Sequence, residues 1–414
     1  MGMTIIEKII KNHSKEEVSP GNIVWLDIDL RSARDFGGAN VVANFKKHYP
    51  DSKLDDPAKT AFTFDCVVPA NNIPYATNQQ ICRDFAKEQK MKLFDVNMGI
   101  GSHVDIDEGL CIPGDTVVGT DSHLNILGSI CTFGQGMGDI DVAFTFKTGK
   151  TWFEVPPTIK VNVKGLLKPP CTPKDLTLII VKHFGASGAL GKAVEFYGDA
   201  IESLSLDGRI TLASMVTEMG GIIGLIPPNS NILDYCSKMS GKTVFPDLKA
   251  DKNAVYEKTI DIDITGLTPQ IAVPPYPHNV KAVKDVEGKK VDSVFIGSCT
   301  NGRYDDIALV AKYLDGKSIA PNIMMKLVPA TRKIYGKLLE EGIIDKLFNA
   351  GVIVSHPGCG GCASGQIGMT GKGEVQLSTG NRNFEGKQGL GLNYLVSPAT
   401  AAVSAINGHI TLPV

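Results

Sequence analysis

Three cysteines near the C-terminal end of the sequence lie in glycine-rich segments. Cys299 lies within residues 297–301, and Cys359 and Cys362 form a C-x2-C pair within residues 357–362. Glycine lets the backbone approach a bulky inorganic ligand closely, and cysteine thiolates are the usual ligands of iron–sulfur clusters. If three thiolates hold a four-iron cluster, one iron keeps an open position. Such an iron can act as a Lewis acid on a substrate oxygen.

Two other kinds of metal site remain open on these residues. A structural zinc site could form from the three cysteines and His356, although zinc would not explain the glycine-rich turns. An electron-transfer cluster would need a fourth cysteine, for which Cys66 and Cys111 are the candidates. For Cys66, a small buried apolar residue is the simpler explanation. The odd number of cysteines, nine in all, argues against a disulfide framework.

Four polar loops follow predicted strands and could supply the remaining reactive groups. Because ligands of α/β folds gather at the carboxyl ends of strands, these loops are candidates for a shared site. Asp121 and His123 form an Asp-x-His element that could act as a general acid or base. Arg382 offers a planar, two-pronged donor for a carboxylate. With an open iron, these groups suit the removal of water from a hydroxy acid. The loops are 65–69, 99–103, 119–123 and 379–387.

The composition is that of a globular protein with more than one domain. The chain has 414 residues, of which 43% are hydrophobic and 21% charged, and its net charge is −2. No apolar run is long enough to span a membrane, and the N-terminus does not resemble a signal peptide. We therefore expect a cytoplasmic location. The near-neutral charge supplies no field for nucleic-acid binding.

The order of the predicted elements indicates an α/β fold. Strands are predicted at 22–30, 158–163 and 291–296, with helices between them. Proline-rich segments at 156–157 and 274–277 indicate boundaries between domains. We expect three domains, which cover residues 1–157, 158–278 and 279–414.

Five segments carry a resemblance to the aconitase superfamily, and the chain resembles its 3-isopropylmalate dehydratase large-subunit type in length and ending. They follow in the family's order, and weaker similarity covers most of the chain. The resemblance implies three aconitase-like domains with α/β/α layers around one iron–sulfur cluster, without the family's fourth, swivelling domain. That domain is then expected on a separate small subunit, without which the chain should be inactive. The segments are 120–123, 297–301, 357–362, 381–386 and 395–400.

The resemblance also implies a role for each residue of the site. Cys299, Cys359 and Cys362 would hold one [4Fe-4S] cluster, with Asn301 and Asn381 as its neighbours. The implied catalytic residues are Asp65, His103, Asp121 and His123, and the implied substrate-binding residues are Ser122, Arg382 and Lys387.

The activity implied by the resemblance is that of a hydro-lyase of leucine-biosynthesis type. It would dehydrate and rehydrate a malate-type 2-hydroxy di- or tricarboxylic acid, with 3-isopropylmalate as the first candidate. Related dehydratases act on 2,3-dimethylmalate, citramalate or citraconate, homoaconitate or aconitate, and these substrates stay open. A non-catalytic metal-binding or RNA-binding regulator is the alternative of another class, although the chain lacks the basic clusters that RNA binding favours.

Three positions depart from the family pattern. Cys66 follows Asp65 where the family usually has histidine, and Lys387 replaces an arginine, which keeps the charge but loses the two-pronged geometry. Ile222 stands where the family usually has a glutamate, and Glu218 lies four residues earlier. These departures bear on which acid is the substrate.

Overall fold

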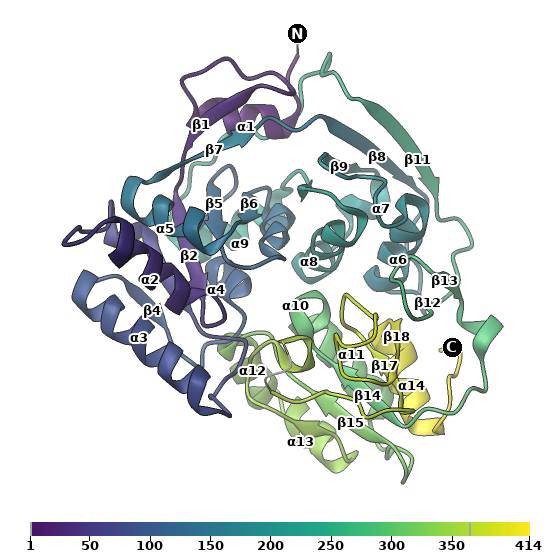
Figure 1. Ribbon diagram of the computed structural model, residues 1–414. Helices are drawn as coiled ribbons and strands as arrows, with labels where there is room; N and C mark the ends of the chain where they lie inside the picture. Colours follow the sequence, from purple (N-terminus) through teal and green to yellow (C-terminus); the bar gives the residue numbers. More distant parts are fainter. Residues whose placement is uncertain (1, 364–365) are drawn as a thin grey trace.

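The computed structural model describes residues 2–363 and 366–414. Within these ranges, the strands form three larger sheets and one two-stranded pair. The three sheets and their helices follow one another along the chain and surround a common centre, where the short helix α10 (Ser298–Asn301) lies (Figure 1). None of the helices in the described ranges has both the length and the apolar character that crossing a membrane requires.

The first sheet lies between residues 30 and 136 and has the order β4-β3-β2-β5-β6, with every neighbouring pair parallel. Parallel neighbours end at one edge, so the residues that follow β2, β3 and β5 come together there. The strands are β2 (Leu30–Arg34), β3 (Thr60–Thr63), β4 (Lys92–Phe94), β5 (Thr116–Gly119) and β6 (Phe133–Gly136). The accompanying helices are α2 (Gly38–His48), α3 (Ile73–Gln89), α4 (Gly101–Asp107) and α5 (Asp139–Thr148).

The N-terminal segment differs from the sequence prediction. After α1 (Ile5–His13), the strand predicted over 22–30 ends early as β1 (Ile23–Asp27), which pairs with β7 (Lys150–Glu154) in the two-stranded pair. The chain then enters the first sheet as β2. Asp29 fixes this break because its carboxylate accepts a hydrogen bond from the Thr116 N–H at 3.0 Å.

The second sheet lies between residues 158 and 263, and its order β10-β9-β8-β11 is parallel throughout. Helix α6 begins with a capping box of Thr172 and Asp175, with Pro173 in its first turn. Helix α8 continues into a 3-10 turn, η3 (Met215–Met219), which carries Glu218. The strands are β8 (Thr158–Lys164), β9 (Ala193–Tyr197), β10 (Ile223–Leu225) and β11 (Lys258–Asp263), and the helices are α6 (Pro173–Phe184), α7 (Asp199–Glu202), α8 (Leu206–Ser214) and α9 (Ser230–Ser240).

The third sheet has seven strands in the order β13-β12-β18-β17-β14-β15-β16. Its five strands from β18 to β16 are parallel, and β12 and β13 add an antiparallel hairpin at one edge. The strands are β12 (Gln270–Ala272), β13 (Val280–Ala282), β14 (Ser293–Ile296), β15 (Met324–Leu327), β16 (Ile353–Val354), β17 (Val375–Ser378) and β18 (Leu392–Val396). The helices are α11 (Tyr304–Leu314), α12 (Arg332–Glu340), α13 (Ile343–Asn349) and α14 (Pro398–Asn407).

The predicted boundary between 278 and 279 falls inside this third sheet. Pro274 and Pro275 lie in the turn between β12 and β13, which pair with each other. The proline pair therefore makes a hairpin turn, and the sequence reading of it as a linker was wrong. Strand β8 begins at Thr158, and the boundary expected between 157 and 158 stays a prediction.

Candidate active site

The loop that carries Cys299 follows the fully buried strand β14. Gly297 has φ +145°, and a Cβ there would lie 2.8 Å from the Val328 carbonyl oxygen. Ser298 also has a positive φ, +70°. This tight turn delivers Cys299, which is 6% exposed, to the centre of the molecule. The position of the thiol is thus set by backbone geometry that requires glycine.

The segment with Cys359 and Cys362 approaches the same place from the end of β16. Gly360 has φ +61°, and a Cβ there would meet the Phe295 ring at 2.7 Å. The three cysteine thiols line one cavity of about 390 Å³. Loops of the first sheet and the loop after β17 of the third sheet form the rest of its wall. Besides the three cysteines, the cavity is lined by Arg34, Phe36, Cys66, Thr120, Asp121, Ser122, His123, Phe384, Gly386 and Lys387.

Two of the three thiols receive hydrogen bonds from nitrogen donors. Asn381 Nδ2 donates to Cys299 Sγ at 3.1 Å, and Arg34 Nη2 donates to Cys359 Sγ at 2.7 Å. Such donors stabilise sulfur as a thiolate, the form that binds metal. His356 bonds the Val68 carbonyl through Nε2 and is not part of the cavity wall. The donor set therefore fits an iron–sulfur cluster better than a zinc site completed by His356.

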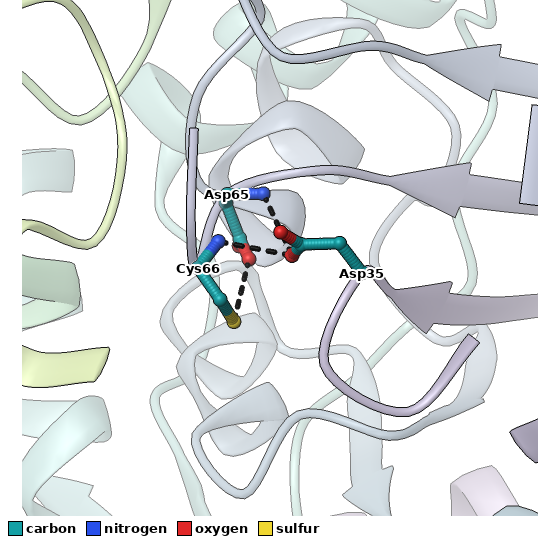
Figure 2. A group of neighbouring side chains, drawn as sticks. All are labelled: Asp35, Asp65 and Cys66. Atoms are coloured by element: carbon teal, nitrogen blue, oxygen red, sulfur yellow. Dashed lines mark hydrogen bonds between the residues drawn. The ribbon is translucent and has the colours of Figure 1, made fainter. Parts of the chain in front are cut away.

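Cys66 lies at the cavity, beside Cys359. Its thiol hydrogen-bonds with Cys359, which together with burial raises the pKa of Cys66 well above its ordinary value. Its sulfur also lies 3.3 Å from Asp65 Oδ1 (Figure 2). The other candidate for a fourth cysteine, Cys111, is directed to the Asp105 carbonyl at 3.9 Å and is not a wall residue.

Asp35 organises the loop that holds Asp65 and Cys66 (Figure 2). Ligand atoms of these three residues lie within 4.8 Å of one another, which suggests a metal site. Asp35, however, already accepts hydrogen bonds from the N–H groups of Asp65, Cys66 and Val67 at 2.9 to 3.2 Å, and from the side chain of Gln79 at 3.2 Å. Its oxygens are committed to the loop, so it acts as a structural cap.

Arg34 connects the first sheet to the cysteines and was not predicted from the sequence. It is the last residue of β2, and its Nε donates to Asp65 Oδ1 at 2.7 Å while Nη1 donates to Asp121 Oδ1 at 2.9 Å. Burial raises the pKa of Asp65 to about 6, with Arg34 opposing the rise. Burial also acts on Asp121, but the charges of Arg34 and His123 hold the pKa of Asp121 below its ordinary value.

His123 joins side chains from three parts of the chain. Its Nε2 lies 3.0 Å from Glu218 Oε1 and 3.0 Å from Asn381 Nδ2. Glu218 also accepts a hydrogen bond from Arg382 Nε at 2.8 Å. Burial would raise the pKa of Glu218, but its interactions with His123 and Arg382 hold that pKa below its ordinary value. Glu218 thus occupies the site, and Ile222 packs instead against an apolar cluster under the N-terminal helix.

His103 and Asn301 lie behind the cysteine loop and are not wall residues. His103 Nε2 donates to the Cys299 carbonyl at 3.0 Å, and its Nδ1 lies 3.3 Å from Arg303 Nη1. Burial and the Arg303 charge lower the pKa of His103 to about 4. Asn301 Nδ2 donates to Thr211 Oγ1 and to an aspartate of α11. Both side chains brace the loop from the side away from the cavity.

Sequence reasoning brought most of this site together but missed two of its members. Arg34 and Asp35 directly follow β2, and the break in the predicted strand 22–30 hid this strand end. A signal was available, because Arg34 and Asp35 are consecutive charged residues shortly after the alternating segment 22–30. Glu218 was noted in the sequence, yet its contact with His123 depends on how the second sheet packs against the first.

Three sheets surround a cavity lined by cysteines, and comparison with known families identifies the class of protein that has this arrangement. A family model described as the aconitase family (aconitate hydratase) matches residues 7–289 and 281–408. The chain belongs to the aconitase family, and the expectation of a hydro-lyase is confirmed. Membership of this family also implies an iron–sulfur centre.

Individual relatives cover the whole chain. The probable 3-isopropylmalate dehydratase large subunit of Methanothermobacter thermautotrophicus is 41% identical over 417 residues, which are 100% of this chain and 99% of the relative. The 3-isopropylmalate dehydratase large subunit 1 of Thermotoga maritima is 41% identical over 419 residues, with the same coverage. The crystal structure of aconitase X from Thermococcus kodakaraensis, in its holo-form, matches with a TM-score of 0.53 at 12% identity. That match covers 86% of this chain and 83% of the other, and it supports the predicted aconitase-like fold.

Proposed function

We propose that the chain is the catalytic large subunit of an iron–sulfur hydro-lyase that removes and re-adds water on a malate-type 2-hydroxy acid. The relatives described above make 3-isopropylmalate the first candidate substrate. One observation carries the proposal: three cysteines from two distant segments line the same cavity as Asp121 and His123. Thiolate ligands and an acid–base pair on one wall suit dehydration of a hydroxy acid.

Cys299, Cys359 and Cys362 are the residues that would hold a [4Fe-4S] cluster. Asn381 and Arg34 each donate an N–H to one of these sulfurs, and the glycine at 360 leaves room for the turn. A cluster bound through three thiolates supplies an iron with a position open to the substrate's hydroxyl oxygen.

His123 is the candidate proton donor to the departing hydroxyl. Its Nε2 is paired with Glu218, and its backbone N–H donates to Asp121 Oδ1 at 3.0 Å, so the ring and its loop are held in place. A carboxylate partner stabilises the protonated imidazole. Asp121 supplies a carboxylate on the cavity wall, Asp65 is held beside it by Arg34, and His103 positions the Cys299 loop.

Arg382, Lys387 and Ser122 would bind the substrate's carboxylates. Arg382 uses Nε for Glu218, and within the described residues no hydrogen bond occupies its two Nη nitrogens. These nitrogens can therefore make a two-pronged contact with a carboxylate. Lys387 adds a positive charge on the cavity wall, where Arg382 is not a lining residue, and Ser122 adds a hydroxyl there.

A separate small subunit would complete the site. The relatives are named large subunits, and two exposed aromatic side chains, Phe36 and Phe384, lie at the cavity with 69% and 46% exposure. Exposed aromatic side chains at the rim of a polar pocket are typical of an interface. We place the small subunit over this rim, where it would supply the base that takes the proton from carbon.

The test is to purify the chain without oxygen, measure iron, zinc and sulfide, and assay it with and without its small subunit. We expect about four irons per chain and formation of an unsaturated product only from the pair. Zinc in place of iron and sulfide would contradict the cluster. Activity of the isolated chain would contradict the need for the partner.

The substrate itself is tested with a panel of 2-hydroxy acids given to the pair. The panel contains 3-isopropylmalate, 2,3-dimethylmalate, citramalate, homocitrate and citrate. We expect 3-isopropylmalate to have the highest kcat/KM, because relatives of that name match the full chain. A higher value for another acid would transfer the assignment to that acid, and no product from any of them would contradict the hydro-lyase itself.

A further inference from the structure

One guanidinium group bridges three acidic groups of the site. Arg34 donates from Nε to Asp65, from Nη1 to Asp121 and from Nη2 to Cys359 Sγ, at 2.7, 2.9 and 2.7 Å. The acceptors come from three separate segments, and the Arg34 side chain is only 15% exposed. Such an arrangement uses the planar fork of arginine, which a lysine cannot reproduce.

We propose that Arg34 is a positioning residue that couples the cluster ligand Cys359 to Asp65 and Asp121. This inference rests on the function proposed above. Arg34 holds the carboxylates of Asp65 and Asp121, of which Asp121 lines the cavity, in fixed orientations, and it draws electron density from the Cys359 sulfur. A donor to a ligand sulfur favours the reduced cluster and makes its open iron a stronger Lewis acid.

Further hydrogen bonds fix the backbone of Arg34 and the orientation of its two carboxylate partners. Its backbone N–H donates to Thr120 Oγ1 at 2.9 Å, which fixes the end of β2 against the loop after β5. Asp65 Oδ2 accepts from the Gly101 N–H at 2.8 Å, and Asp121 Oδ2 accepts from Ser102 Oγ at 3.3 Å. Each carboxylate therefore has a second donor that sets its angle toward Arg34.

The positive charge of Arg34 balances the negative charges of its three partners. When Cys359 is a thiolate, three negative groups surround this one cation in a largely buried wall. Removing the cation would leave buried negative charges without their partner, which is strongly unfavourable. We therefore expect replacement of Arg34 to change the reduction potential of the cluster as well as the stability of the fold.

Arg31 provides a matched control on the same strand. It is 3% exposed and pairs with Asp55 at 2.8 Å, on a side of β2 that does not line the cavity. Arg31→Lys and Arg34→Lys make the same chemical change three residues apart on β2, the first outside the site and the second inside it. Arg34→Met removes the charge as well as the fork.

The experiment measures the reduction potential of the cluster by EPR-monitored titration, together with kcat and KM, in the holoenzyme with its small subunit. We expect Arg34→Met to shift the potential to lower values and to lose kcat by about tenfold to a hundredfold. Arg34→Lys should recover part of the shift, because it restores charge without the fork, and Arg31→Lys should match the wild type.

An unchanged potential in both Arg34 variants, with the wild type active, would overturn the inference and leave the proposed function standing. A wild type without a cluster signal would overturn the proposed function itself. If Arg34→Met does not fold, Arg34→Lys alone tests the inference. A reduction potential and a kcat of Arg34→Lys that equal those of the wild type would contradict the proposed role of the guanidinium fork.

Discussion

Glu218 Oε1 lies 3.0 Å from His123 Nε2 and also accepts a hydrogen bond from Arg382 Nε at 2.8 Å. The three side chains come from the loop after β5, from η3 and from the loop after β17. The proposed proton donor and the proposed carboxylate-binding residue therefore share one carboxylate. This link ties the first and third sheets together through a residue of the second.

Glu218→Gln keeps the size of the side chain but removes its charge. We expect kcat to fall by about tenfold to a hundredfold, because the imidazole of His123 loses the carboxylate that stabilises its protonated form. Iron content should stay unchanged. Steady-state kinetics of the holoenzyme would check this, with the exposed Glu202 as control in the variant Glu202→Gln. Equal kcat values for Glu218→Gln and the wild type would refute the role.

Cys66→Ser should leave the iron and sulfide content of the protein unchanged. The Cys66 thiol hydrogen-bonds with Cys359, so we expect it to lie beside a proposed cluster ligand and not to bind iron itself. Cys299→Ser, Cys359→Ser and Cys362→Ser should each lower the iron content. Metal and sulfide analysis of the four variants provides the comparison, and loss of iron from Cys66→Ser would show that it is a fourth ligand.

Phe36→Ser should weaken binding of the small subunit without altering the cluster. Phe36 is 69% exposed at the cavity rim, and aromatic side chains at the centre of an interface contribute strongly to affinity. We expect Kd to rise by about tenfold or more in titration calorimetry. Phe348→Ser is the control, because Phe348 is 75% exposed on α13, away from the cavity wall. Equal effects of both variants would place the interface elsewhere.

Asp105 on α4 should make the protein less stable as pH rises. It is fully buried, and neither of its carboxylate oxygens has a hydrogen-bond partner within the described residues. Burial, with Asp121 and Asp65 nearby, raises the pKa of Asp105 from 3.8 to about 8. Between these values the folded protein binds more protons than the unfolded chain. The free energy of unfolding therefore falls as pH increases through this window.

Asp105→Asn removes this titration. We expect the variant to depend less on pH than the wild type between about pH 5 and pH 8 and to have a higher Tm at about pH 9. Thermal unfolding across this range would measure the difference. Asp234→Asn, at an exposed position of α9, should follow the wild type. Parallel curves for Asp105→Asn and the wild type would contradict the buried, protonated carboxyl.

Local sequence patterns were enough for the parts of the site that lie within single loops. Cys299, the Cys359 and Cys362 pair and the Asp121 and His123 element each occupy a few consecutive residues, and the structure gathers all of them at one cavity. Their residue types and glycine neighbours carry the chemical information directly.

Contacts between distant segments could not be read in the same way. Arg34 reaches Asp65 and Asp121 only because β2 lies between β3 and β5 in a parallel sheet. Sequence periodicity does not give that strand order. In the same way, the turn at Pro274 and Pro275 has the composition of a linker, and only the pairing of β12 with β13 shows that it closes a hairpin.

The central claim is that Cys299, Cys359 and Cys362 hold a four-iron cluster with one iron open to substrate. Mössbauer spectroscopy of the ⁵⁷Fe-labelled holoenzyme, with and without the preferred hydroxy acid, tests it most directly. We expect one iron in four to change its signal when the acid is added, while the other three stay the same. A spectrum in which no iron responds to the acid, or a protein that contains zinc and no iron, would contradict the claim.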